Sequence, residues 1–141
     1  RDGRSFVSRA NTDKLTVQVN GQFVTATIQP TALNEADALT ITATTALAAS
    51  RAIFAAFPEA EAVMVALLSE FTSPTGQIST DRSAMIQVNR ATADKWAYDG
   101  LKSRVQSDNK HLFCLADKYQ IHPAGYAKLK DKGCLRGAAK L

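Results

Sequence analysis

The chain has 141 residues, the ordinary size of one domain, and a domain of this size buries roughly two thirds of the surface of its unfolded chain. With 45% hydrophobic and 21% charged residues, it has too many apolar residues for a disordered protein. No stretch reaches the roughly 18 to 20 uninterrupted apolar residues of a transmembrane helix, and the net charge of +4 is concentrated from Lys95 onward.

The N-terminal residues 1–12 are mainly polar and are expected to form a flexible arm, followed by a single α+β domain at residues 13–141. The chain begins at Arg1 and has no apolar signal region. We therefore expect that a natural upstream segment has been removed, and a signal peptide or membrane anchor would fit that position.

The stretch Leu15–Ile28 predicts a β-hairpin, because apolar and polar residues alternate on both sides of Asn20-Gly21, a dipeptide typical of a type I′ turn. A turn at these two residues would pair Val19 with Gln22. One face would then pack on the core; its residues are Leu15, Val17, Val19, Val24, Ala26 and Ile28.

The other face of this hairpin would carry one aromatic side chain, Phe23, together with Thr16, Gln18, Thr25 and Thr27. An aromatic residue on a polar face is either a contact residue or covered by another segment, here the N-terminal arm. Phe23 and Thr25 are therefore candidate binding residues.

A helix is predicted from Asn34, a suitable N-cap followed by acidic residues, to about Phe57, where Pro58 ends it. Its buried stripe has a spacing of three to four residues and consists of Leu39, Ala43, Leu47, Ser50, Ile53, Phe54 and Phe57. Thr42, Thr45 and Arg51 fall outside the stripe.

Residues 62–71 are apolar at most positions, as in a central strand, and a turn at Ser73–Gly76 leads to an alternating strand at Arg82–Asn89. Thr92 is a plausible N-cap for a helix that ends near Ser107. The element order predicts a two-layer ββαββα arrangement with a four-stranded, mostly antiparallel sheet and the helices on one face.

From about residue 109 a C-terminal helical appendage is expected, with short helices at Lys110–Tyr119 and Pro123–Lys132. Its two cysteines and two histidines are Cys114, Cys134, His111 and His122. Three interpretations are open: a disulfide between Cys114 and Cys134, two free thiols, or a Cys2His2 zinc site whose ligand spacing is unusual.

The same segment has the spacing of a helix-turn-helix, whose basic second helix could enter a major groove. This nucleic-acid-binding function is the alternative prediction. The spacing is easily imitated by any helical hairpin, and a disulfide there would argue against a cytosolic DNA-binding protein.

No enzyme is predicted, because the sequence has no Gly-rich phosphate loop, nucleophile elbow, His-Glu-x-x-His helix or Cys-x-x-Cys pair. A thiol and imidazole pair of Cys114 with His111 or His122 is the only nucleophile arrangement available. Four acidic residues near strand ends could gather as carboxylates: Glu59, Glu61, Glu70 and Asp81. No catalytic residue, cofactor or metal is assigned.

The remaining hypothesis is binding. Phe23, Thr25 and Met85, with Met64 and Leu68 from the central strands, would form a contact surface on the uncovered side of the sheet. We expect a non-enzymatic protein-binding or assembly domain at the cell envelope, the extracytoplasmic soluble part of a secreted or membrane-anchored protein. Its partner would be another protein or a second copy of the chain.

Overall fold

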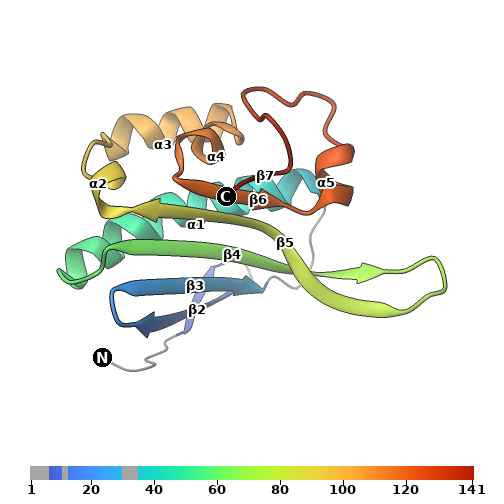
Figure 1. Cartoon of the computed structure of the whole chain (residues 1–141), viewed down its shortest axis with the longest axis horizontal. Coiled ribbons are helices and arrows are strands. Elements are labelled where there is room, and N and C mark those ends of the chain that lie inside the picture. Colours follow the sequence, from blue (N-terminus) through green and yellow to red (C-terminus); the bar gives the residue numbers. More distant parts are fainter. Residues whose placement is uncertain (1–6, 11–12, 30–34) are drawn as a thin grey trace.

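A computed structural model describes residues 7–10, 13–29 and 35–141 of the chain. They form one seven-stranded sheet in which the strands follow one another in sequence order (Figure 1). The strands are β1 (Val7–Ala10), β2 (Asp13–Asn20), β3 (Phe23–Gln29), β4 (Ala62–Thr72), β5 (Ile78–Asn89), β6 (Lys118–Ile121) and β7 (Ala139–Lys140). Neighbouring strands are antiparallel except β3 and β4, which are parallel.

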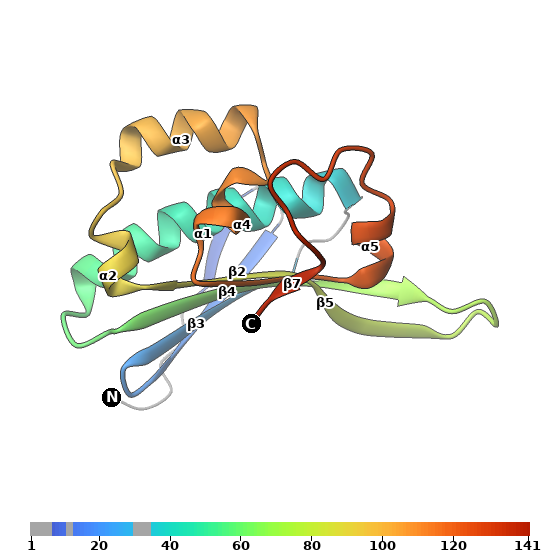
Figure 2. The same ribbon diagram turned by 45° about the horizontal axis from the view of Figure 1, so that its top comes forward.

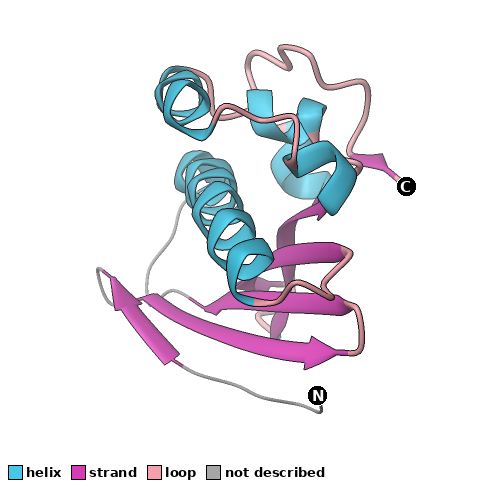
Figure 3. Ribbon diagram, turned by 90° about the vertical axis from the view of Figure 1, so that its left-hand side faces the viewer, coloured by secondary structure: helices cyan, strands magenta, loops and turns pink. Residues whose placement is uncertain are grey.

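Five helices are described: α1 (Glu35–Ala56), α2 (Arg90–Ala93), α3 (Tyr98–Ser107), α4 (His111–Leu115) and α5 (Pro123–Ala127). They lie on one side of the sheet (Figure 3). The predicted α+β class is confirmed, but the prediction of four strands is wrong. The extra strands β1, β6 and β7 have four residues or fewer, too few for an alternating pattern to be detected.

Part of the predicted N-terminal arm is a strand, because Val7–Ala10 pair with β2. Residues 1–6 and 11–12 lie outside the described residues. The expected N-cap of α1, Asn34, also lies outside them.

The first hairpin forms with a register two residues away from the predicted one. Asn20 pairs with Phe23 and Val19 with Val24, so the turn is Gly21-Gln22. Gly21 has φ +63°. Type I′ and type II′ hairpin turns both require a positive φ at their first central residue, and glycine adopts this conformation at low cost. Because a shift of two residues preserves the strand period, the predicted inward residues still face the core.

Helix α1 packs along the middle of the sheet and supplies much of the core. The predicted stripe is buried as expected, from Leu39 to Phe57. Thr42 is also buried, outside that stripe, and its hydroxyl donates to the Ala38 carbonyl at 2.8 Å, so no polar group is left unpaired. Among the described helices, α1 is the one long and apolar enough to cross a membrane by length and composition.

The predicted helix after β5 is in fact two helices, and the chain between α2 and α3 is not helical. Trp96 lies in this break, and its ring packs edge-on against the Tyr98 ring with centroids 5.9 Å apart. The predicted helix Lys110–Tyr119 is also wrong at its end, because Lys118–Ile121 pair with β5 as strand β6. Tyr119 and Ile121 fill the core from this strand.

The hairpin of β4 and β5 extends well beyond the rest of the sheet (Figures 1 and 2). The register shifts at its base: Leu67 pairs with Ala84 but Leu68 with Arg82, which leaves Ser83 as a bulge. The Ser83 carbonyl accepts a hydrogen bond from the His122 amide at 3.0 Å.

One arginine joins the end of α1 to the second half of the sheet. The Arg90 guanidinium donates to the carbonyls of Phe57 at 2.9 Å, Phe54 at 3.3 Å and Ala60 at 2.7 Å. It also lies over the Phe54 ring, 4.7 Å from its centroid. A cation at the C-terminal end of a helix satisfies its last carbonyls and interacts favourably with the helix dipole.

Replacing Arg90 with alanine should lower the free energy of unfolding by about 2–4 kcal/mol, since hydrogen bonds from a charged donor are worth about 1.5–3 kcal/mol each and are not additive. Urea denaturation followed by circular dichroism measures this. Arg51→Ala removes an exposed arginine from the same helix and should cost less than about 1 kcal/mol. Equal costs for the two variants would contradict the anchoring role of Arg90.

Candidate functional site

The sheet register brings the predicted binding residues onto one face. Thr25 on β3 lies beside Met64 on β4, in the same way that Phe23 lies beside Ala62. Met85 on β5 pairs with Ala66 on the other side of β4. Because paired residues in neighbouring strands point to the same side, Phe23, Thr25 and Met85 share the side of the sheet opposite the helices.

We call this surface the helix-free face. On the three central strands it consists of Phe23, Thr25, Thr27, Met64, Ala66, Leu68, Met85 and Gln87. None of these side chains is charged. Two cations border these residues on the same side: Arg82 on β5 pairs with Leu68 and donates to the Gln120 side chain at 3.3 Å, and Lys118 on β6 pairs with Gln87.

The individual residues of this face differ in how much surface they offer. Phe23, Thr25, Met64 and Leu68 are half-buried, whereas Met85 is only 4% exposed. A partner would therefore touch mainly Phe23, Met64 and Leu68, with threonine and glutamine side chains between them. Hydroxyl and amide groups can both donate and accept hydrogen bonds, so this face suits a neutral surface rather than a charged one.

The two cysteines are joined to each other. A disulfide links Cys114 at the end of α4 to Cys134 in the loop before β7, with Cα atoms 6.3 Å apart, a normal separation for a disulfide. The first of the three predicted interpretations is thus confirmed, and the free-thiol and zinc interpretations are wrong. Within the described residues, no three His, Cys, Asp or Glu side chains gather to hold a metal ion.

His122, a candidate base for a Cys114 nucleophile, lies at the base of the β4–β5 hairpin. Its ring stacks on Phe71 with centroids 4.2 Å apart, and its Nε2 lies 3.8 Å from a carboxylate oxygen of Asp81. Its Nδ1 accepts the Ala124 amide at 3.2 Å and so caps α5. These contacts hold the hairpin and α5 together, and Cys114 is not available as a nucleophile beside it.

The four acidic residues near strand ends do not form one cluster. Glu59 and Glu61 precede β4, whereas Glu70 and Asp81 lie in the far part of the β4–β5 hairpin. At about 3.3 Å per strand residue, the two pairs are separated by roughly 25–30 Å along β4.

Asp117 has a structural role that the sequence does not predict. Its carboxylate accepts the Asn89 amide at 2.7 Å and the Thr92 hydroxyl at 2.9 Å, which joins the start of α2 to the chain entering β6. An isolated aspartate in a lysine-rich segment gives no sequence signal for these contacts, because their partners are more than 20 residues away.

The helix-turn-helix expected in the C-terminal segment is not formed. Strand β6 separates α4 from α5, and α5 has only five residues and ends at Ala127. The lysines beyond it lie in irregular structure, where the Lys132 ammonium donates to the carbonyls of Tyr126 and Leu129.

Comparisons of the chain with protein-family models, curated proteins and solved structures found no match. The three predicted binding residues, Phe23, Thr25 and Met85, all lie on the helix-free face. The disulfide lies in a different part of the domain.

The disulfide should stabilise the fold by about 3 kcal/mol in the chain-entropy model, because it closes a loop of 20 residues. Replacing both cysteines with serine should lower the free energy of unfolding by that amount, measured by urea denaturation. Added reductant should lower the stability of the original chain and leave the double variant unchanged. A native chain that is insensitive to reductant would contradict this.

Tyr119 anchors the loop before β7. Its side chain is buried, and its hydroxyl donates to the Gly137 carbonyl at 2.7 Å. Burial raises the pKa of Tyr119 above its ordinary value of 10.0, a backbone hydrogen bond from Arg136 lowers it in part, and the neighbouring Tyr126 raises it. The net direction is upward because removal from water disfavours the phenolate.

A raised pKa in the folded state means that folding favours the neutral form of Tyr119. Its contribution to stability is fully present below the unfolded pKa of about 10 and is lost as the pH rises through the higher folded pKa. Tyr119→Phe should therefore make the fall in unfolding free energy above pH 10 less steep. Denaturation curves at a series of alkaline pH values test this, and identical slopes for both chains would contradict it.

Proposed function

We propose that this chain is a non-enzymatic assembly domain that associates with a protein through the helix-free face of its sheet. The observation that supports this is a group of uncharged side chains across three central strands, with Phe23, Met64 and Leu68 accessible and Arg82 at the border, opposite a face covered by helices. An uncharged sheet surface of this kind is a common site for protein contacts.

The partner that fits this face best is a second copy of the chain. A two-fold interface places the same patch on both sides, so its groups must complement themselves. Threonine and glutamine meet this requirement because each can donate to and accept from its own kind. The net charge of +4 opposes self-association in general, but the cations beside this face, Arg82 and Lys118, border the uncharged residues and do not interrupt them.

We place this domain at the cell envelope, as the soluble part of a secreted or membrane-anchored protein. The disulfide supports an oxidising compartment, since such bonds rarely persist in the cytosol. The Thr25 and Phe23 surface lies on the far side of the sheet from α4, so the disulfide and the contact face are separate features.

Phe23→Asp should convert a self-associating chain to a monomer, because each copy would bury an unpaired carboxylate in the interface. Sedimentation velocity at increasing protein concentration measures this, with circular dichroism to show that the variant is folded. Thr25→Lys should have the same effect through charge repulsion.

Thr44→Lys is the matched control, since Thr44 is exposed on α1 on the opposite side of the sheet and its replacement should leave association unchanged. A native chain that stays monomeric at all concentrations, or equal association of Thr25→Lys and the native chain, would contradict the proposal. Binding of labelled duplex DNA at low salt would instead support the alternative nucleic-acid function, because the phosphate contribution is largest there.

A further inference from the structure

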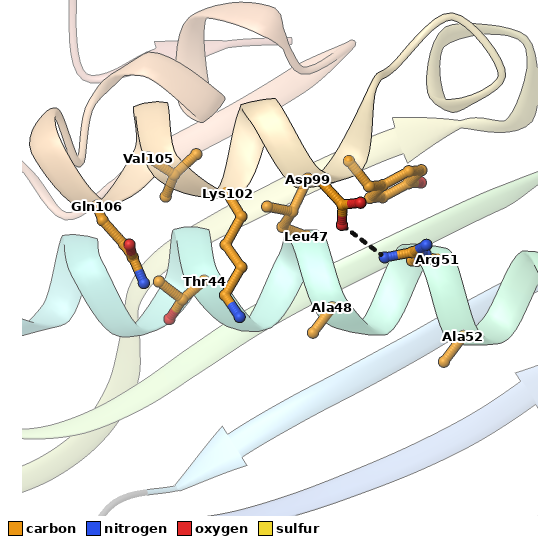
Figure 4. Close-up of a pocket in the computed structure, with 10 residues that line it drawn as sticks. Thr44, Leu47, Ala48, Arg51, Ala52, Asp99, Lys102, Val105 and Gln106 are labelled. Carbon is orange, nitrogen blue, oxygen red and sulfur yellow. Dashed lines mark ion pairs between the residues drawn. The ribbon is translucent and has the colours of Figure 1, made fainter.

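A groove of about 400 Å³ lies between α1 and α3 on the helix side of the domain (Figure 4). We call it the α1–α3 groove. Its size falls in the range of about 300–1,000 Å³ that is typical of small-molecule sites. Most of its lining surface is apolar. Among its apolar lining residues, Ala48 and Ala52 are exposed and Tyr98 is half-buried, whereas Leu47 and Val105 are buried.

Small residues on α1 keep this groove open. Thr44, Ala48 and Ala52 follow one another at one-turn spacing on an exposed side of the helix, where charged side chains would be usual. Helix α3 leaves this row uncovered, although its own Val105 is buried against the core. Apolar surface in the groove is therefore accessible to a ligand.

Two of the lining residues form an exposed ion pair. Arg51 on α1 lies 3.6 Å from a carboxylate oxygen of Asp99 on α3, and its guanidinium lies over the Tyr98 ring at 5.3 Å (Figure 4). The charge of Asp99 is thus already matched by Arg51.

The remaining cation is Lys102, which forms no ion pair with any other described residue. Figure 4 shows its side chain extending from α3 across the groove toward α1, between Thr44 and Ala48. Within the lining of the groove, Arg51 and Lys102 give two positive charges against the one negative charge of Asp99. The groove thus combines an apolar floor with one unmatched positive charge.

We infer that the α1–α3 groove binds a small amphipathic carboxylate, with its alkyl chain along Ala48 and Ala52 and its carboxylate on the Lys102 ammonium. An ammonium is a good partner for a carboxylate, and the apolar floor favours an alkyl chain over a purely polar anion. This site is separate from the helix-free face and does not depend on association through it.

Trp96 provides a direct readout, because it is the single tryptophan of the chain and its ring contacts Tyr98, which lines the groove. Titration with decanoate below its micelle concentration should give a saturable change in tryptophan fluorescence. Lys102→Gln should weaken binding about tenfold, as expected for the loss of one charge-assisted contact. Lys95→Gln, an exposed lysine outside the groove, should leave it unchanged.

Ala48→Leu should abolish the decanoate response by filling the groove, and Ala55→Leu, on the same helix but outside the lining, should not. The uncharged decyl maltoside should bind to the native chain more weakly than decanoate does. The two compounds should bind to Lys102→Gln with equal affinity. A non-saturable response, equal affinity of the native chain for both compounds, or full affinity in Lys102→Gln would overturn the inference. Circular dichroism shows whether each variant is folded. If Ala48→Leu does not fold, the comparison of Lys102→Gln with Lys95→Gln still tests the site.

Discussion

The packing of one long helix against one side of the sheet is the constraint on which the rest of this structure depends. Helix α1 connects β3 to β4, which makes these two strands parallel and places the helix over the centre of the sheet. Its core stripe contains Ala43, Ala46 and Ala49, so it can lie close to the strands. Arg90 then fixes the end of the helix by donating to its last carbonyls, and this joins the first half of the chain to the second.

Covering only one side leaves the sheet with two faces of different chemistry. On the covered side, Val24, Val63 and Ile86 are almost completely buried, whereas the neighbouring residues on the other side are phenylalanine, threonine, alanine, methionine and glutamine. Such a face is neither apolar enough to need a helix nor charged enough to stay well solvated. Association with a similar neutral surface is the arrangement that fits both properties, and this is why the helix-free face supports an assembly function.

Long periodic segments of this fold could be predicted from the sequence, and contacts between distant residues could not. The α1 stripe and the inward face of the first hairpin follow from spacing alone, and the hairpin kept its faces because its register moved by two residues. The strand β6 was missed because only Tyr119 and Ile121 alternate there. The alternation of side chains along a strand predicts that Phe23 and Thr25 share one face. For Cys114, in contrast, a disulfide, a free thiol and a zinc ligand all fit the sequence.

The α1–α3 groove could not be foreseen for a related reason. It exists because the helix predicted after β5 breaks near Trp96, so that α3 lies beside α1 and leaves the row of Thr44, Ala48 and Ala52 uncovered. The groove and the helix-free face therefore lie on opposite layers of the same domain. If two copies stack through their sheets, both grooves face outward and stay open to solvent. Assembly and ligand binding are then compatible in one complex, and occupancy of the groove need not change the association of the sheets.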